Sequence, residues 1–166
     1  MKYKYLKEYS NFEYKYSDLL SNSEYFDYLE DLKTNTDWDD ERAKEDLDYY
    51  LDIVGNLIKN GGQIYRIVWL FSESDLNDDD LGEHWTIDPD FGNFYGNLEN
   101  EEEDDDGNTS KPYLIIAKIE PNNINLDDSL SYYTELPNEL EINIINQPIE
   151  YKIIEFDRYK NYSYLQ

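Results

Sequence analysis

The sequence contains no cysteine, a single histidine and one methionine, and only 14 of its 166 residues are lysine or arginine. Without cysteine the chain can form no disulfide, no zinc–thiolate site and no thiol nucleophile. A serine triad would need His84, but no serine has the glycine-flanked surroundings that such nucleophiles require. Glycine-rich phosphate loops of the Walker and Rossmann types are also missing. These absences exclude most of the common catalytic sets.

Positive charge is the second shortage, because 39 Asp and Glu residues leave a formal net charge of −25. Binding to nucleic acid draws on Lys and Arg that displace cations from phosphates, so the sign of the charge excludes direct binding to DNA or RNA. An anionic membrane surface is repelled for the same reason. The partner that this charge favours is a basic protein, for example a nucleic-acid-binding enzyme.

Aromatic residues compensate for the modest apolar content. The chain has 18 Tyr, 6 Phe and 3 Trp, and each of these side chains buries a large area on folding. A length of 166 residues is typical of one folded unit, so we expect a single domain over residues 1–166. We find no run of about 20 apolar residues and no leader-like start, and we therefore expect a cytoplasmic protein.

Residues 1–60 have the pattern of a helical lobe. Ser10 with Glu13, and Ser21 with Glu24, have the spacing of capping boxes, which predicts two short helices. A longer helix is predicted over residues 39–59. Asp37 is its expected N-cap, and the pair Gly61-Gly62 is expected to end it. Its apolar stripe consists of Ala43, Leu47, Tyr50, Leu51, Val54, Leu57 and Ile58.

Residues 61–166 are predicted to be rich in β-strands. Expected strands cover residues 64–70, 114–119, 139–145 and 151–156, where β-branched residues alternate or cluster between turn signals. Since no helical pattern was recognised between these strands, an α+β fold with mostly antiparallel pairing is favoured over alternating βαβ units.

The segment between residues 71 and 110 is strongly acidic. It contains 15 Asp and Glu residues and no Lys or Arg, and residues 101–106 form an unbroken acidic run. Six adjacent carboxylates cannot share a core without partners, so we expect an exposed loop at about residues 97–110.

Three segments carry residues suited to chemistry. They are Arg66 within a predicted strand, the stretch from Leu81 to Thr86, and the pair Glu139 and Glu141. Their order resembles the R–S–E arrangement of the bacterial and phage mono-ADP-ribosyltransferases. The resemblance covers roughly residues 60–156 and implies a helical lobe followed by a β core split into two sheets. It also implies that NAD is the substrate. The middle segment departs from the family, because it reads His-Trp-Thr rather than Ser-Thr-Ser.

The resemblance also implies a role for each residue. Arg66 would hold the NAD diphosphate, while Thr86, Trp85 and His84 would shape the cofactor pocket, with Trp85 stacking on nicotinamide. Glu141 would stabilise the oxocarbenium-like transition state, and Glu139 would position or deprotonate the acceptor. Tyr132 and Tyr133 would lie on the loop that recognises the target protein. No metal is implied.

Simpler interpretations of these residues remain open. Arg66 could belong to a half-exposed ion pair, Glu139 and Glu141 could line a solvated strand face, and His84 and Trp85 could pack in the core. Under these simpler interpretations the acidic sequence indicates a different function, that of an inhibitor that imitates nucleic acid and occupies a basic groove of another protein. Oligomeric state is not predicted by any of these patterns.

Overall fold

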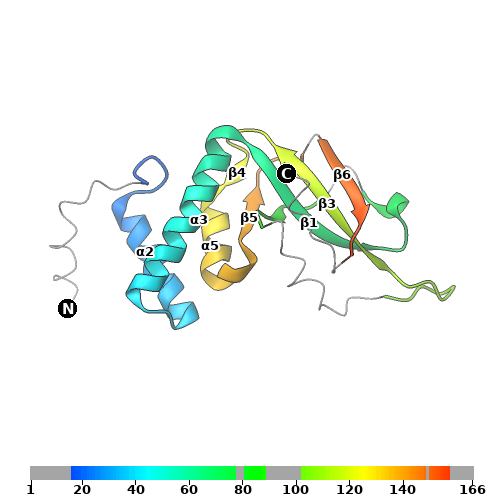
Figure 1. The fold of residues 1–166 in the computed structure, drawn as a ribbon, viewed down its shortest axis with the longest axis horizontal. Coiled ribbons are helices and arrows are strands. Elements are labelled where there is room, and N and C mark those ends of the chain that lie inside the picture. Colours follow the sequence, from blue (N-terminus) through cyan, green and yellow to red (C-terminus); the bar gives the residue numbers. More distant parts are fainter. Residues whose placement is uncertain (1–15, 78–80, 89–101, 149, 158–166) are drawn as a thin grey trace.

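The strands form one sheet, and the helices pack at one end of it (Figure 1). The computed structural model describes residues 16–77, 81–88, 102–148 and 150–157. The helices are α2 (Asn22–Thr36), α3 (Asp40–Asn60) and α5 (Leu126–Glu135), with 3₁₀ turns at Glu73–Asp75 and Pro137–Glu139. The strands are β1 (Gly62–Leu70), β2 (His84–Thr86), β3 (Lys111–Ile119), β4 (Ile124–Asn125), β5 (Glu141–Ile144) and β6 (Glu150–Glu155).

Helix α2 begins where the sequence predicts it. The Ser21 side chain accepts a hydrogen bond from the Glu24 backbone and the Glu24 side chain caps Ser21 in return, which is the expected capping box. The expected N-cap of the next helix is wrong by two residues. Asp37 ends α2 in the left-handed conformation, and Asp39 caps α3 instead. The predicted box at Ser10 lies outside the described residues.

Helix α3 confirms the prediction for residues 39–59 to within one residue at each end. Its predicted stripe is buried from Ala43 to Leu57. Gly61 ends the helix with φ +68°, and a β-carbon at that position would lie 2.3 Å from the Ile119 carbonyl oxygen. Glycine is therefore required there both by the backbone conformation and by the close approach of β3.

The six strands form one antiparallel sheet in the order β4-β5-β2-β1-β3-β6, so the expected split into two sheets is wrong. The sheet is continuous because β2 pairs with β1 on one side and with β5 on the other. The strands predicted at 64–70, 114–119 and 151–156 are confirmed as β1, β3 and β6, with small shifts at their ends.

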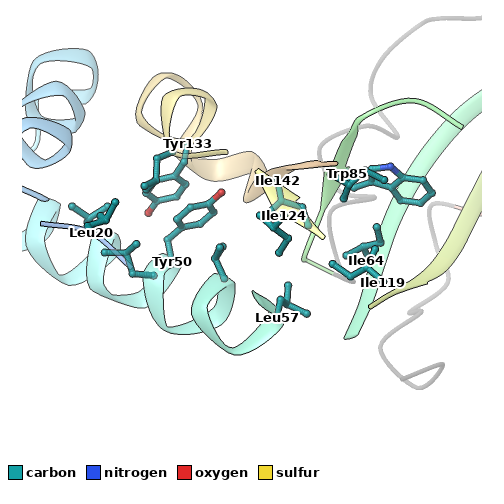
Figure 2. Packing of buried hydrophobic residues seen from close by; sticks show 14 of the residues in the cluster. Leu20, Tyr50, Leu57, Ile64, Trp85, Ile119, Ile124, Tyr133 and Ile142 are labelled. Carbon is teal, nitrogen blue, oxygen red and sulfur yellow. The ribbon is translucent and has the colours of Figure 1, made fainter. Parts of the chain in front are cut away.

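Helix α5 was not predicted, because Ser, Tyr and Thr are weak helix formers and its segment was interpreted as a loop. Asn125 caps it by accepting a hydrogen bond from the Asp128 backbone. Leu130 and Tyr133 face the core, where the Tyr133 ring stacks on Tyr50 with centroids 3.9 Å apart (Figure 2). The region after residue 61 therefore contains a helix between β4 and β5.

Strand β5 is shorter than the predicted strand over 139–145. Residues Pro137–Glu139 form a 3₁₀ turn, and Leu140 adopts φ +45°, which is left-handed backbone. The turn is held from β2, because the Thr86 hydroxyl donates to the Glu139 carbonyl at 2.7 Å and the Ile87 amide donates to the Leu140 carbonyl. Glu139 consequently precedes the strand instead of belonging to it.

Both faces of the sheet carry apolar clusters. The larger one joins the helices to the sheet through residues such as Leu57, Ile64 and Ile142 (Figure 2). The smaller one lies on the other face of β1 and β3 and contains Tyr65, Leu114, Ile116 and Phe156. Among the described residues, no helix is both long and apolar enough to cross a membrane.

The described part of the acidic run, residues 102–106, is exposed or half-exposed as predicted. It belongs to a short hairpin that projects beyond the sheet (Figure 1). Glu103 bridges to Thr109, and the Asp104 side chain accepts hydrogen bonds from the backbones of Asp106 and Asn108. These turn contacts hold the pKa of Asp104 below its ordinary value, with the Asn108 side chain as the largest cause.

Removal of this hairpin tests whether it is dispensable for folding. We expect deletion of residues 103–109 to change the free energy of unfolding by no more than about 0.5 kcal/mol, the scale of surface changes. Its ends are already joined, because the Ser110 amide donates to the Glu102 carbonyl at 2.8 Å. Chemical denaturation measures the effect. A loss of several kcal/mol would show that the acidic hairpin is part of the packed structure.

Candidate functional site

Strands β1, β2 and β5 are neighbours in the sheet, and they bring together residues that are far apart in the sequence. Arg66 lies on β1, His84 and Thr86 on β2, and Glu141 at the start of β5. These residues line one cavity of about 160 Å³ together with Tyr65, Ile67 and Trp85. The three segments singled out in the sequence therefore meet at one place.

The cavity lies where β1 and β2 part. The two strands pair at a single position, Tyr65 with Thr86, and Thr86 pairs in turn with Glu141, so these three residues share a face of the sheet. Arg66 follows Tyr65, so its side chain leaves β1 on the opposite face of the sheet from Tyr65 and reaches toward β2. One of its guanidinium nitrogens, Nη1, donates to the His84 carbonyl oxygen at 3.0 Å.

Gly82 makes room for this arginine. Its backbone has φ +84°, and a β-carbon there would lie 2.0 Å from Nη1 of Arg66. Only glycine combines that backbone conformation with so close an approach. Gly82 was not recognised as a site residue from the sequence, and its only signal is its place two residues before His84.

Glu141 is a partly buried acid that contacts His84. Its Oε1 atom lies 2.6 Å from Nδ1 of His84, and its side chain is only 16% exposed. Burial raises the pKa of Glu141 above its ordinary value, and the charge of Glu139 adds to the increase. His84 acts in the opposite direction, as a neighbouring cation or hydrogen-bond donor does.

Glu139 is a neighbour of Glu141 in space although it does not lie on the strand. It belongs to the 3₁₀ turn, and its carboxyl group is near enough to that of Glu141 to raise the pKa of Glu141. The expectation that both acids occupy the same strand face is wrong, yet the two carboxyl groups still meet. A pair of neighbouring carboxyl groups holds a shared proton more readily than either does alone.

Thr86 supports the turn that carries the acids. Its hydroxyl is buried, donates to the Glu139 carbonyl and accepts from the Asp88 amide at 3.1 Å. Tyr50 on α3 holds the start of β5, because its hydroxyl donates to the Glu141 carbonyl at 2.5 Å. Tyr50 was recognised only as a core residue, since sequence spacing does not show which backbone a tyrosine hydroxyl reaches.

The aromatic residues expected at the site differ in their exposure. Trp85 is 1% exposed, packs with Ile64 in the core and donates its indole N–H to the Gly82 carbonyl (Figure 2). Tyr132 is 38% exposed, and its ring meets His84 edge-on with centroids 4.5 Å apart. Tyr132 therefore lies beside the site.

The assignment of Tyr132 and Tyr133 to a recognition loop is wrong, because both residues belong to helix α5. Tyr133 is buried, and its hydroxyl donates to the Asp46 carbonyl at 2.9 Å. Successive residues of a helix face different directions, so Tyr132 reaches the site while Tyr133 fills the core. Burial also raises the pKa of Tyr133.

The described part of the chain offers no group of three or more His, Asp or Glu side chains arranged to hold a metal ion. Comparison with protein-family models, with curated proteins and with solved structures gives no match for this chain.

The raised pKa of Glu141 predicts that this carboxylate destabilises the fold at neutral pH. A group whose pKa is higher in the folded state contributes favourably only while it is protonated, so its ionisation costs stability as the pH rises. We expect Glu141→Gln to raise the thermal unfolding temperature at about pH 7. The gain should vanish below the ordinary value of 4.5, where the acid is protonated in both states. A variant less stable than the wild type at neutral pH would contradict this assignment.

Replacement of Gly82 tests whether the Arg66 guanidinium packs against the backbone of Gly82. Gly82→Ala should lower the free energy of unfolding by roughly 1–3 kcal/mol for the backbone strain alone, and by more because of the contact with the guanidinium. The control is the same substitution in an Arg66→Ala background, where the backbone strain remains and the guanidinium is gone. Equal losses in the two backgrounds, measured by denaturant unfolding, would mean that Arg66 does not pack against Gly82.

Proposed function

We propose that this chain is an NAD-consuming mono-ADP-ribosyltransferase, which transfers ADP-ribose to a basic target protein. The observation that carries the proposal is the meeting of Arg66, Thr86 and Glu141 from three adjacent strands around one cavity. The resemblance seen in the sequence requires these three residue types in this order. Their convergence could not follow from sequence order alone, because they are separated by tens of residues.

The chemistry assigned to Glu141 is electrostatic. When the bond between the ribose C1′ and the nicotinamide nitrogen breaks, nicotinamide leaves with the electron pair and positive charge develops on the ribose. A preformed carboxylate near C1′ stabilises that charge in the transition state. The raised pKa of Glu141 indicates the cost of keeping this carboxylate in a partly buried place, which is typical of functional acids.

Glu139 is assigned to the acceptor. Its carboxyl group lies on the turn next to Glu141 and is half-exposed, so a side chain of the target can approach it. The acceptor nitrogen or oxygen forms the new bond to C1′ and gives up its proton, which a carboxylate at this position can take. The products are nicotinamide, the ADP-ribosylated protein and one proton.

The size of the cavity limits how NAD can bind. Its volume of about 160 Å³ is smaller than the ~300–1,000 Å³ typical of sites that enclose a whole ligand. It can hold one ring of the dinucleotide, so the proposal places the nicotinamide end inside and the remainder outside. Arg66 supplies positive charge at the wall, which favours the diphosphate.

The net charge of −25 has opposite effects on the two substrates. NAD is an anion and is repelled at long range, but salt screens exposed charges beyond a distance of about 8–10 Å. A basic protein is attracted, which raises its rate of encounter. The charge therefore favours a cationic target and leaves NAD binding to the short-range contacts of the cavity.

The second candidate is an acidic inhibitor that imitates nucleic acid and binds without turnover. The exposed carboxylates of the hairpin over residues 102–106 favour it, because they form a compact negative projection. Such a protein acts at one copy per target and does not need NAD. Stoichiometry and NAD dependence separate it from the enzyme.

Incubation with labelled NAD and a cell lysate tests the proposed activity. We expect the wild type to label a protein at sub-stoichiometric concentration. Glu141→Gln should lower the labelling rate by a factor of about 10²–10³, the scale for losing one transition-state contact. Because this variant should remain folded, the loss cannot be assigned to unfolding.

The matched control is Glu150→Gln, which makes the same chemical change at an exposed position on β6. It should label as the wild type does. Equal labelling by the wild type and by Glu141→Gln would end the catalytic assignment. Labelling by neither protein, together with tight binding to a basic target, would favour the inhibitor.

A further inference from the structure

His84 has an unusual place in the cavity. Its Nδ1 atom is buried and makes no aligned hydrogen bond in the described part of the chain, although it lies 2.6 Å from Oε1 of Glu141. The rest of its side chain is not enclosed, since 42% of it is exposed. When Glu141 is ionised, a hydrogen bond at this contact requires a proton on Nδ1, because a carboxylate can only accept.

The ring of His84 is held on two sides. The backbone of His84 belongs to β2, and its carbonyl accepts the hydrogen bond from Arg66. Tyr132 on α5 meets the ring edge-on, at an interplanar angle of 84°. Edge-to-face contacts favour one ring orientation, so the imidazole is oriented before any ligand arrives.

We propose that His84 is a positioning residue for Glu141, whose carboxylate it orients and keeps ionised by donating the Nδ1 proton to Oε1. Neither the sequence resemblance nor the proposed function assigns this pairing. Its effect on catalysis rests on the proposed function, but the pairing itself does not.

The proposal accounts for how a partly buried acid can remain charged beside a second acid. Glu139 and burial both disfavour the ionised form of Glu141, and His84 opposes them. Arg66 on β1 lines the same cavity, Tyr132 on α5 contacts the His84 ring, and the Tyr50 hydroxyl on α3 donates to the backbone of Glu141. His84 places a nitrogen 2.6 Å from the carboxyl group of Glu141.

The tautomer of His84 tests the pairing without any assay of activity. The chain has one histidine, so its imidazole nitrogens give one set of ¹⁵N NMR signals. In the neutral imidazole of the full-length wild type, we expect the proton on Nδ1. Glu141→Ala removes the acceptor and should move the proton toward Nε2, whereas Glu139→Gln should leave the tautomer unchanged. A wild type protonated on Nε2 would overturn the proposal.

Two substitutions of His84 then test its role in the reaction. The amide nitrogen of asparagine can occupy the place of Nδ1, so His84→Asn should keep the labelling rate within about threefold. His84→Ala lacks a donor and should lower the rate by about tenfold or more, because a small misplacement of a reacting group is costly. The acid limb of its pH–rate profile should move to higher pH, since the group that lowers the pKa of Glu141 is gone.

The outcomes separate the two proposals. A wild type without labelling activity refutes the proposed function, and the tautomer measurement still decides the pairing. An active wild type whose pH profile is unchanged in His84→Ala refutes the positioning role and leaves the proposed function intact. Asparagine and alanine variants that are equally impaired would also refute it.

Discussion

The structure depends on strand β2, which has three residues and joins the two parts of the sheet. On one side it pairs with β1, which leads to β3 and β6, and on the other with β5 and β4. Each of its residues also makes a contact that shapes the site. His84 meets Glu141, Trp85 enters the core, and Thr86 holds the turn before β5.

This arrangement explains why the cavity lies at the β1–β2 gap. Pairing at one position brings the strands together at Tyr65, and Arg66 then fills the space where they diverge. The large core behind the sheet keeps the strands in place, so the polar residues need not stabilise the fold themselves. Glu141 is instead a net cost at neutral pH, as the direction of its pKa shift requires.

The sequence was sufficient to predict the elements that local chemistry determines. The capping box at Ser21, the stripe of α3 and the glycine pair that ends it are confirmed, because caps, periodicity and glycine act within a few residues. The three segments that carry Arg66, Thr86 and Glu141 were also recognised, and they line one cavity.

Features set by tertiary contacts were not predictable in this way. Helix α5 is built from weak helix formers and is stabilised by packing of Leu130 and Tyr133. The single sheet depends on β2, which is too short to show a pattern. Glu139 lies in a turn and not in the predicted strand, because the hydroxyl of Thr86, 53 residues away in the sequence, donates to its carbonyl.

The most direct test of the account is whether NAD enters the cavity. His84 lines this cavity and is the only histidine of the chain, so its imidazole signals report on the site alone. Titration of the full-length protein with NAD should shift those signals saturably, and Arg66→Ala should weaken the response. Unchanged imidazole signals at millimolar NAD, with the protein folded, would contradict an NAD site at this place.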